Sequence, residues 1–382
     1  MPIYLDNAAT SHPKPEAVYA AALHAMRDIG ASPGRGGHRR SIEASRVVFR
    51  ARESLARLFS IDDSSRIIFT HSTTESLNLA LRGLLRSGDH VVTTSMEHNS
   101  LLRPLALLQK QGVSLTVVPA GRDGLVSPDD LKTALKRKTR LVAVGHVSNV
   151  CGTIQPIHEL AAAAHQAGAL FLLDAAQSAG CLPVDVPGTG IDLLAAPGHK
   201  GLLGPQGTGI LYAADHVQIT PLLQGGTGSH SSSEEQPEGF PEGFESGTHN
   251  LPGIAGLGAG VEYILERGVE SIAADERQLT EQIARTLGAL AGITLYGPAV
   301  PECRGAVLSF TIRGIDPSRL ATDLDQHHDI AVRAGLHCAP RAHRTIGTFP
   351  HGTLRVSPGL FTSREDVAIF CAAVVECVKN AA

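Results

Sequence analysis

The sequence predicts an α/β protein: a large domain built on a mostly parallel, mixed sheet flanked by helices, plus a smaller α+β C-terminal domain. Residues 65–215 alternate short apolar runs with amphipathic patterns, which is typical of parallel strands joined by helices. After a segment rich in Gly, Ser, Pro and Glu at 224–250, strand and helix patterns mix without that alternation. We expect a large domain at 16–255 and a small domain at 256–382, with residues 1–15 packing alongside the small one.

Each element follows from a local pattern. Apolar runs predict strands at 66–70, 91–94, 115–118, 141–144 and 169–173, and later at 306–311 and 352–356. Amphipathic patterns predict helices at 74–85, 101–111, 157–166, 253–265 and 272–290. One more helix opens with Ser127 as its N-cap and Pro128 in its first turn. The segment at 224–250 is expected to be a long, mobile loop.

Composition excludes several functional classes. The 382 residues are 43% hydrophobic and 18% charged, with a net charge of −4, so a nucleic-acid partner is not expected. There is no basic and apolar leader and no apolar run near the ~20 residues of a membrane span, so we expect a cytoplasmic protein. The six cysteines lack Cys-x-x-Cys spacing and most should be reduced, with Cys371 and Cys377 packed in a core. No zinc-type spacing is present, and we expect no metal site.

Polar side chains follow several of the predicted strands directly. Thr73, His98, Asn149 and Asp174 all lie just past a strand end. In open α/β sheets, ligands bind beyond the carboxyl ends of the strands. We therefore expect these four side chains to converge on one site.

The nature of that site is indicated by Asp174 and Lys200. Asp174 ends one buried strand, and Lys200 follows the apolar run 191–194. Pyridoxal phosphate (PLP) enzymes use a lysine amine to form a Schiff base and a carboxylate to keep the pyridine nitrogen protonated. Surface lysines and strand-end aspartates are common, however, so the pair needs support from its neighbours.

Three neighbouring motifs fit a PLP site, and the first two have an ordinary alternative. Thr73 and Thr74 open a helix and could hold a phosphate, or this segment could serve only as an N-cap. His98 could stack on the cofactor ring and exchange protons with the substrate, or be a solvated loop histidine. Gln177 could donate a hydrogen bond to the phenolic oxygen of the cofactor.

A cysteine and an arginine near the C-terminus suggest the reaction. Cys338 lies in a Gly/Pro loop beside Arg333, His337 and Arg341, cations that would favour the nucleophilic thiolate. Arg355, in a strand-like segment, could bind a substrate carboxylate through two hydrogen bonds, or form only a surface salt bridge.

Taken together, these motifs resemble the fold-type I PLP enzymes of the class V aminotransferase superfamily, and within it the cysteine desulfurases and selenocysteine lyases. The resemblance covers nearly the whole chain. Its matching segments are 4–10, 73–75, 97–99, 148–150, 174–178, 198–200, 204–207, 245–248, 333–338 and Arg355.

The resemblance implies a role for each matching residue. Lys200 would form the Schiff base and move protons at Cα, while Asp174 would pair with the pyridine nitrogen. The ring and phenolic oxygen would contact His98 and Gln177. The phosphate would be held by Thr73, Thr74, His199 and Thr248, the last from the partner subunit of a homodimer. Asn149 would line the substrate side.

The same resemblance implies the chemistry. Arg355 would bind the substrate carboxylate, and Cys338 would attack the sulfur, leaving L-alanine and a persulfide for a sulfur-acceptor protein. The short loop between Cys338 and Arg355 resembles the Suf-type (group II) subgroup. Leu336 and Pro197 depart from that pattern, where histidine and serine are usual, which places the chain in a less characterised branch.

The expected function is therefore a PLP-dependent cysteine desulfurase acting on L-cysteine. Selenocysteine lyase, which acts on L-selenocysteine, is the nearest alternative. Another class V lyase or aminotransferase, in which Cys338 is incidental, and a non-catalytic PLP-binding scaffold are more distant ones. The segment 226–243 could dock a sulfur acceptor or cover the active site.

Overall fold

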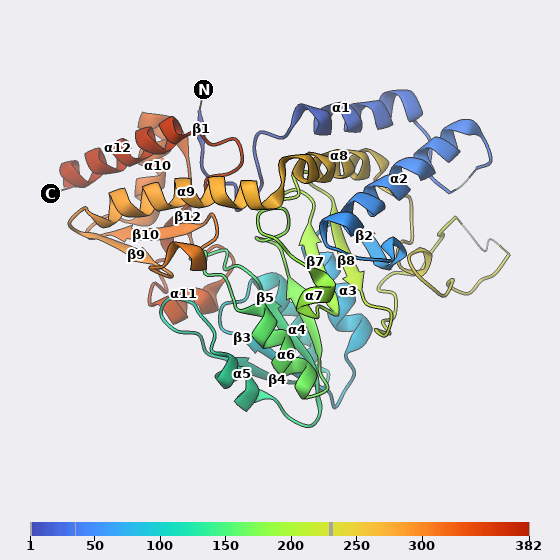
Figure 1. The fold of residues 1–382 in the computed structure, drawn as a ribbon. Helices are drawn as coiled ribbons and strands as arrows, with labels where there is room; N and C mark the ends of the chain where they lie inside the picture. Colours follow the sequence, from blue (N-terminus) through green and yellow to red (C-terminus); the bar gives the residue numbers. More distant parts are fainter. Residues whose placement is uncertain (1, 35, 229–231, 382) are drawn as a thin grey trace.

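The computed structural model describes residues 2–34, 36–228 and 232–381. Its centre is a seven-stranded sheet with strand order β2-β8-β7-β6-β5-β3-β4 (Figure 1). These strands are β2 (Ile67–Thr70), β3 (His90–Thr94), β4 (Ser114–Val118), β5 (Thr139–Gly145), β6 (Leu170–Asp174), β7 (Leu193–Pro197) and β8 (Gly209–Ala213). Only β8 runs antiparallel to its neighbours, which confirms the mostly parallel, mixed sheet.

Helices cover both faces of this sheet because its strands are apolar on both sides. The connecting helices are α3 (Thr73–Leu84), α4 (Asn99–Lys110), α5 (Pro128–Ala134), α6 (Ile157–Gln166) and α7 (Val186–Thr189). α3 and α4 share one hydrophobic cluster with the sheet, and α6 shares the other. Ser127 caps α5 by accepting a hydrogen bond from the backbone N–H of Asp130, as predicted.

A third group of helices covers the same face as α6. It comprises α1 (Glu16–His24), the π-helix η1 (Ala25–Ile29), α2 (Arg39–Leu58) and α8 (Leu251–Arg267). α8 packs against both α1 and α2, as Figure 1 shows at the upper right. We predicted neither α1 nor α2 from the sequence, although the apolar residues of α2 recur at helical spacing.

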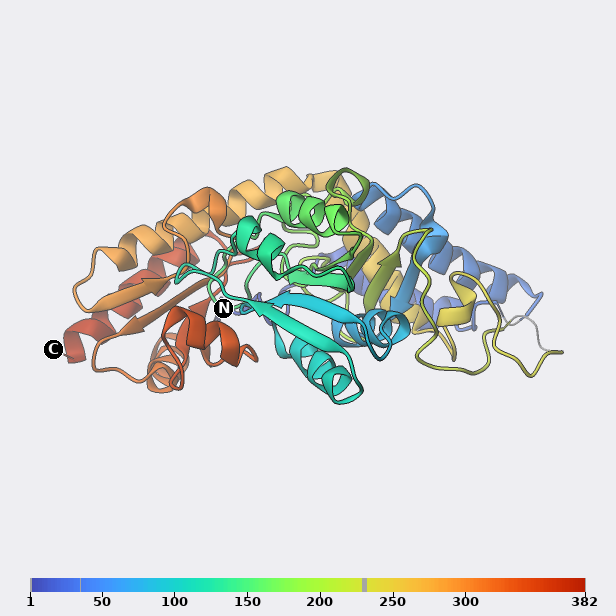
Figure 2. The same ribbon diagram turned by 90° about the horizontal axis from the view of Figure 1, so that it is seen from below.

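The C-terminal part is built on a four-stranded antiparallel sheet with strand order β12-β13-β10-β9. Its strands are β9 (Ile293–Tyr296), β10 (Leu308–Ile312), β12 (Arg333–Gly335) and β13 (Thr353–Val356). Its helices are α9 (Val269–Gly288), α10 (Pro317–His328), α11 (Pro340–Ile346) and α12 (Arg364–Ala381). Figure 2 shows this part beside the central sheet, with α9 running along both.

The N-terminal segment joins the C-terminal part. β1 (Ile3–Tyr4) pairs in parallel with β11 (Ile330–Ala331), and Leu5 belongs to the hydrophobic cluster of the small sheet. Cys371 is buried in that cluster and Cys377 packs against it, which confirms their predicted core role. The domain limits 16–255 and 256–382 stay a prediction.

Two local differences from the predictions have clear causes. The strand before Lys200 covers 193–197 and not 191–194, because the N–H of Ile191, just past α7, donates to the carbonyl oxygen of Val186 at the start of that helix. Part of the 224–250 segment is docked: Phe240 and Phe244 stack at 4.4 Å and pack against the core beneath α3 and α4. That segment also contains the short turn η3 (Glu242–Phe244), and its residues 229–231 lie outside the described residues. Two further 3-10 turns are η2 (Ser64–Arg66) and η4 (Pro301–Cys303).

Candidate active site

The predicted convergence at the strand ends is present. A cavity of about 190 Å³ opens at the carboxyl ends of β3, β5 and β6. Its wall includes eight of the predicted site residues: Thr73, Thr74, His98, Asn149, Asp174, Gln177, His199 and Lys200. Cys338, Arg355 and Thr248 lie outside this wall, and the first two approach it through hydrogen bonds described below.

Asp174, at the end of β6, is buried, and Lys200, in the turn after the adjacent strand β7, is half-buried; both line this cavity. Burial raises the pKa of Asp174, although the N–H of Ala176, which donates to its Oδ1 at 3.0 Å, and the Lys200 charge oppose that rise. Burial lowers the pKa of Lys200 to about 8, against the opposing attraction of Asp174. A lysine with a pKa of about 8 has far more free amine at neutral pH than an ordinary lysine, and the free amine is the form that attacks a carbonyl carbon.

At the start of α3, different residues serve as the helix cap and as the candidate anion site. Ser72 is the N-cap, since its hydroxyl accepts a hydrogen bond from the N–H of Glu75. The Oγ1 of Thr73 is buried and has no hydrogen-bond partner in the part of the chain that the structure describes, whereas that of Thr74 bonds Ser100 at 2.8 Å. Capping alone therefore does not account for Thr73.

His199, next to Lys200, leaves a second polar atom without a partner. Its Nδ1 is buried and unpaired. The pKa of His199 is lowered to about 4, mainly by burial and further by the positive charges of Lys200 and Lys14. Thr73 Oγ1, at the start of α3, and His199 Nδ1 thus lie in one cavity wall as buried polar atoms without a partner among the described residues, which fits an oxyanion ligand such as a phosphate.

His98 is not a solvated loop residue, because it is the N-cap of α4 and half-buried. The backbone N–H of Ser100 donates to its Nδ1 at 3.1 Å, so Nε2 carries the proton in the neutral ring. Burial, with nearby cations led by Lys200, lowers the pKa of His98 to about 4. The imidazole is therefore neutral at pH 7, with one N–H to offer a ligand.

Glu97 is a buried carboxyl group that sequence reasoning placed in a motif without giving it a role. It is 2% exposed and lines the cavity between His98 and Gly145. Thr94 Oγ1 bonds its Oε1 at 2.5 Å, and the N–H of Gly145 donates to its Oε2 at 2.9 Å. Burial raises its pKa to about 8. A neutral Glu97 leaves Asp174 as the principal negative charge of the cavity.

Gln177 extends from the cavity toward the N-terminal segment. Its Nε2 donates to the carbonyl oxygen of Ala8 at 2.9 Å. Together with Lys200 it also lines a second, smaller cavity of about 40 Å³, whose wall includes Cys181 and Glu276. Burial raises the pKa of Glu276 to about 8.

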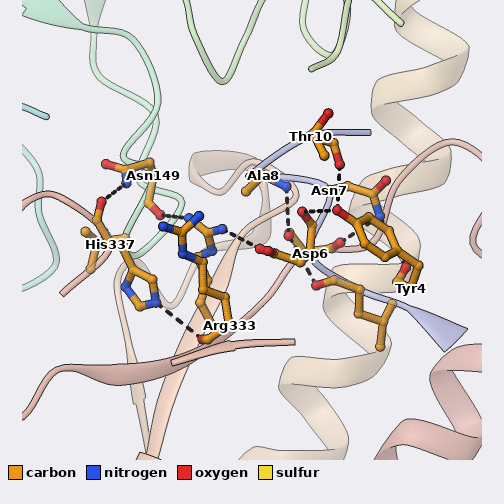
Figure 3. Close-up of polar contacts among 12 residues, drawn as sticks. Tyr4, Asp6, Asn7, Ala8, Thr10, Asn149, Arg333 and His337 are labelled. Carbon is orange, nitrogen blue, oxygen red and sulfur yellow. Dashed lines mark hydrogen bonds and ion pairs between the residues drawn. The ribbon is translucent and has the colours of Figure 1, made fainter. Parts of the chain in front are cut away.

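Arg355 is buried at 2% exposure, so the surface-salt-bridge interpretation is wrong. Its two terminal nitrogens bond Asp6 Oδ1 at 2.6 Å and the carbonyl oxygen of Asn149 at 3.0 Å, while its Nε has no partner among the residues that the structure describes. Figure 3 shows Arg333 in this cluster, between Asp6 and the Asn149–His337 pair. Asp6 was not predicted as a site residue, since the residue that it pairs with lies 349 positions away.

Cys338 is exposed on a loop that is fastened to the cavity wall at two points. The amide of Asn149 donates to the carbonyl oxygen of His337 at 2.8 Å, and the N–H of Asn99 donates to that of Cys338 at 2.8 Å. His337 and Cys338 adopt the left-handed backbone conformation, with φ of 47° and 56°. Non-glycine residues seldom adopt it, and such outliers cluster at functional sites.

Thr248 is exposed and belongs to a separate hollow beside β2. Its segment is anchored by a buried ion pair between Arg52 and Glu245, with two N–O distances of 2.8 and 2.9 Å. The structure does not bring Thr248 to the cavity of the same chain.

All six cysteines are free thiols. Across the described residues, no helix combines the length and apolar character that crossing a membrane requires. Within that same part of the chain, His, Cys, Asp and Glu side chains form no group of three or more that could hold a metal ion.

The comparison with known proteins decides the family. The model of the class V aminotransferases matches residues 3–370. The chain belongs to this family. A probable cysteine desulfurase of Methanothermobacter thermautotrophicus is 39% identical to this family member, over 96% of this chain and 92% of the relative.

Solved structures of the family agree with this fold. Cysteine desulfurase from Thermococcus onnurineus matches with a TM-score of 0.93 and 36% identity, over 99% of this chain and 95% of that one. The cysteine desulfurase CsdA of Escherichia coli matches with a TM-score of 0.90 and 29% identity, over 100% and 96%. The class V member therefore has the fold-type I architecture that the sequence predicted.

Proposed function

We propose that this protein is a PLP-dependent cysteine desulfurase, which converts L-cysteine to L-alanine and leaves a persulfide on Cys338. The observation that carries the proposal is the attachment of the exposed Cys338 loop to the cavity that contains Lys200 and Asp174. A nucleophilic thiol fastened beside a lysine–carboxylate site has both groups that sulfur removal from an amino acid needs.

The cavity residues fit the cofactor. The unpaired Thr73 Oγ1 and His199 Nδ1 would hold its phosphate, with Thr74 beside them. Asp174 would hold the proton on its pyridine nitrogen, and Lys200 would bind it covalently. Bound PLP supplies an electron sink for the bonds at the substrate's Cα and Cβ.

The side chains of this chain then perform distinct tasks. The substrate carboxylate would lie against the Arg355 cluster, where Nε has no other partner. Lys200 takes the proton from Cα and returns protons to carbon, a task that suits its lowered pKa. His98 presents its Nε2–H toward the ligand, and Gln177 contributes to the phenolic side.

Cys338 completes the reaction. Its thiolate attacks the substrate sulfur, so the Cβ–S bond breaks and an S–S bond forms. The thiol sulfur is oxidised to a persulfide and Cβ is reduced to the methyl group of alanine, which balances without an external oxidant. A sulfur-acceptor protein or a reductant thiol then removes the outer sulfur atom.

Several finer features are part of this proposal on the strength of the resemblance. They are a homodimer in which Thr248 of one subunit completes the phosphate site of the other, the Suf-type subgroup, a sulfur-acceptor partner and a cytoplasmic location. The same holds for the domain limits 16–255 and 256–382, with residues 1–15 beside the small domain.

The test compares the wild-type holoenzyme with Cys338→Ala, and uses Cys303→Ala as a matched control because Cys303 is also exposed but outside the site. L-Cysteine is supplied with a reductant, and alanine and sulfide are quantified. We expect both products to vanish in Cys338→Ala only, with PLP still bound. Mass spectrometry without reductant should find one extra sulfur atom on the Cys338 peptide.

Undiminished alanine from Cys338→Ala would overturn the proposal. L-Selenocysteine serves as the comparison substrate. Turnover of selenocysteine alone, surviving in Cys338→Ala, would instead identify a selenocysteine lyase in which Cys338 has no part.

A further inference from the structure

Exposed arginines lie on α4 and α11, the two helices next to the Cys338 loop. No Asp or Glu occurs between Asp329 and Glu365, whereas arginines recur through that stretch. Arg341 and Arg344 are exposed on α11, and Arg103 is exposed on α4. Among the described residues, none of these three arginines has an ion-pair partner. We call Arg103, Arg341 and Arg344 the basic rim.

The basic rim is held at a fixed position relative to Cys338. α11 begins two residues after Cys338, and Arg341 and Arg344 are one helical turn apart, about 5 Å along the helix axis. Buried His343 links the helix to the loop, since its Nε2 lies 3.3 Å from Nδ1 of His337. Its own Nδ1 bonds Thr348 at 2.7 Å, which anchors the other end of the helix.

α4 is tied to the same loop. The N–H of Asn99, at the start of α4, donates to the carbonyl oxygen of Cys338. Arg103 lies four residues later, on the same face of that helix as Asn99. Its charge also reaches His98, whose pKa it helps to lower. The rim therefore approaches Cys338 from two elements.

An exposed aromatic ring lies against one residue of the basic rim. Phe349 is 42% exposed, and the guanidinium of Arg344 lies over its ring at 4.3 Å. Arginine and aromatic side chains are enriched where proteins bind one another. The guanidinium of Arg344, which forms no ion pair among the described residues, and the exposed ring of Phe349 therefore offer a partner both positive charge and apolar surface.

We propose that the basic rim is a docking surface for an acidic segment of the protein that accepts sulfur from Cys338. This rests on the proposed function, because a persulfide on Cys338 gives such a partner its reason to bind. The acceptor thiol must come within bonding distance of an exposed cysteine, so the charges that surround that cysteine select which partner surface can approach. Carboxylate side chains are the protein groups that complement three unpaired arginines.

The test uses three synthetic peptides as probes, each with one cysteine flanked by glutamates, by glutamines or by lysines. The holoenzyme is first loaded with one equivalent of L-cysteine without reductant. Peptide persulfide is then followed by mass spectrometry. In low salt we expect the glutamate peptide to react about tenfold faster than the glutamine peptide, a modest steering effect. That ratio should fall toward one as salt shortens the screening length from about 30 Å at 0.01 M to about 3 Å at 1 M.

Charge reversal supplies the decisive variants. In Arg341→Glu/Arg344→Glu, the lysine peptide should react faster than the glutamate peptide. Comparing the two peptides within one variant cancels any effect of Arg341 on the Cys338 thiol itself. Arg285→Glu/Arg313→Glu reverses two exposed arginines outside the rim and is the control for net charge. Comparing each peptide between variants cancels the intrinsic reactivity of its thiol.

Three outcomes would overturn the proposal: equal rates for the glutamate and glutamine peptides at low salt, a faster lysine peptide with the wild type, or an equal change in the control variant. Failure of the proposed function would look different, since the wild type would then yield no persulfide before any peptide is added.

Discussion

Replacing Asp6 with alanine should destabilise the protein although the residue lies in the N-terminal segment. Asp6 is the anionic partner of Arg355, at 2.6 Å, and the side chain of Arg355 is 2% exposed. Among the described residues, the only other group bonded to the guanidinium is the carbonyl oxygen of Asn149. Removing Asp6 would therefore leave a buried positive charge without an opposite charge.

The size of the effect follows from burial. Breaking a fully buried ion pair from one side costs about 3–5 kcal/mol, since the remaining charge stays desolvated. The side chain of Asp6 is 18% exposed, so water reaches one edge of the pair and screens it. We therefore expect a loss of about 2–3 kcal/mol in the free energy of unfolding. Asp6→Asn, which keeps an acceptor oxygen, should lose less.

Urea unfolding of the cofactor-free protein, followed by circular dichroism, measures this loss. The matched control is Asp275→Ala, which removes an ion pair with Arg267 of similar length, 2.8 Å, whose side chains are 47% and 49% exposed. Exposed pairs contribute about 0–1 kcal/mol, so the control should unfold close to wild type. Equal losses in Asp6→Ala and Asp275→Ala would refute the argument from burial.

Three further predictions concern the two cavities and the turn that contains Lys200. Thr73→Val should weaken PLP binding about tenfold or more in a spectroscopic titration, because it removes a hydroxyl that would bond a charged phosphate. The stability of the cofactor-free protein should stay nearly unchanged. Unaltered affinity for PLP would exclude Thr73 from the site. Gly198→Ala should lower the free energy of unfolding, measured in urea, by about 1–3 kcal/mol and should weaken PLP binding. The added Cβ would collide with the side chain of Thr208, next to the turn that contains Lys200. A free energy of unfolding equal to that of the wild type would contradict this prediction. Burial raises the pKa of Glu276 to about 8, so the folded protein binds more protons than the unfolded chain between pH 4.5 and about 8, and stability falls as pH rises through that window. In Glu276→Gln that fall should be shallower, and an unchanged pH profile of the unfolding free energy would count against it.

The sequence by itself determined the α/β architecture and the position of the site within it. Strand and helix patterns are local, because side-chain periodicity depends only on the backbone conformation of a few residues. Parallel strands carry their carboxyl ends to one edge, so Asp174 and Lys200 could be placed in one site without coordinates. Patterns of this kind also located the loop of Cys338.

Tertiary structure alone decided how the site residues are charged and paired. The sequence did not decide whether Arg355 lies on the surface or in the interior. Its burial against Asp6 depends on chain segments that are 349 positions apart. Likewise, nothing in the sequence marks the carboxyl group of Glu97 as unusual. In the folded protein Thr94 and Gly145 donate hydrogen bonds to it, and burial raises its pKa to about 8. Desolvation and ion pairing depend on every atom that surrounds a group, and folding brings those atoms together from distant parts of the chain.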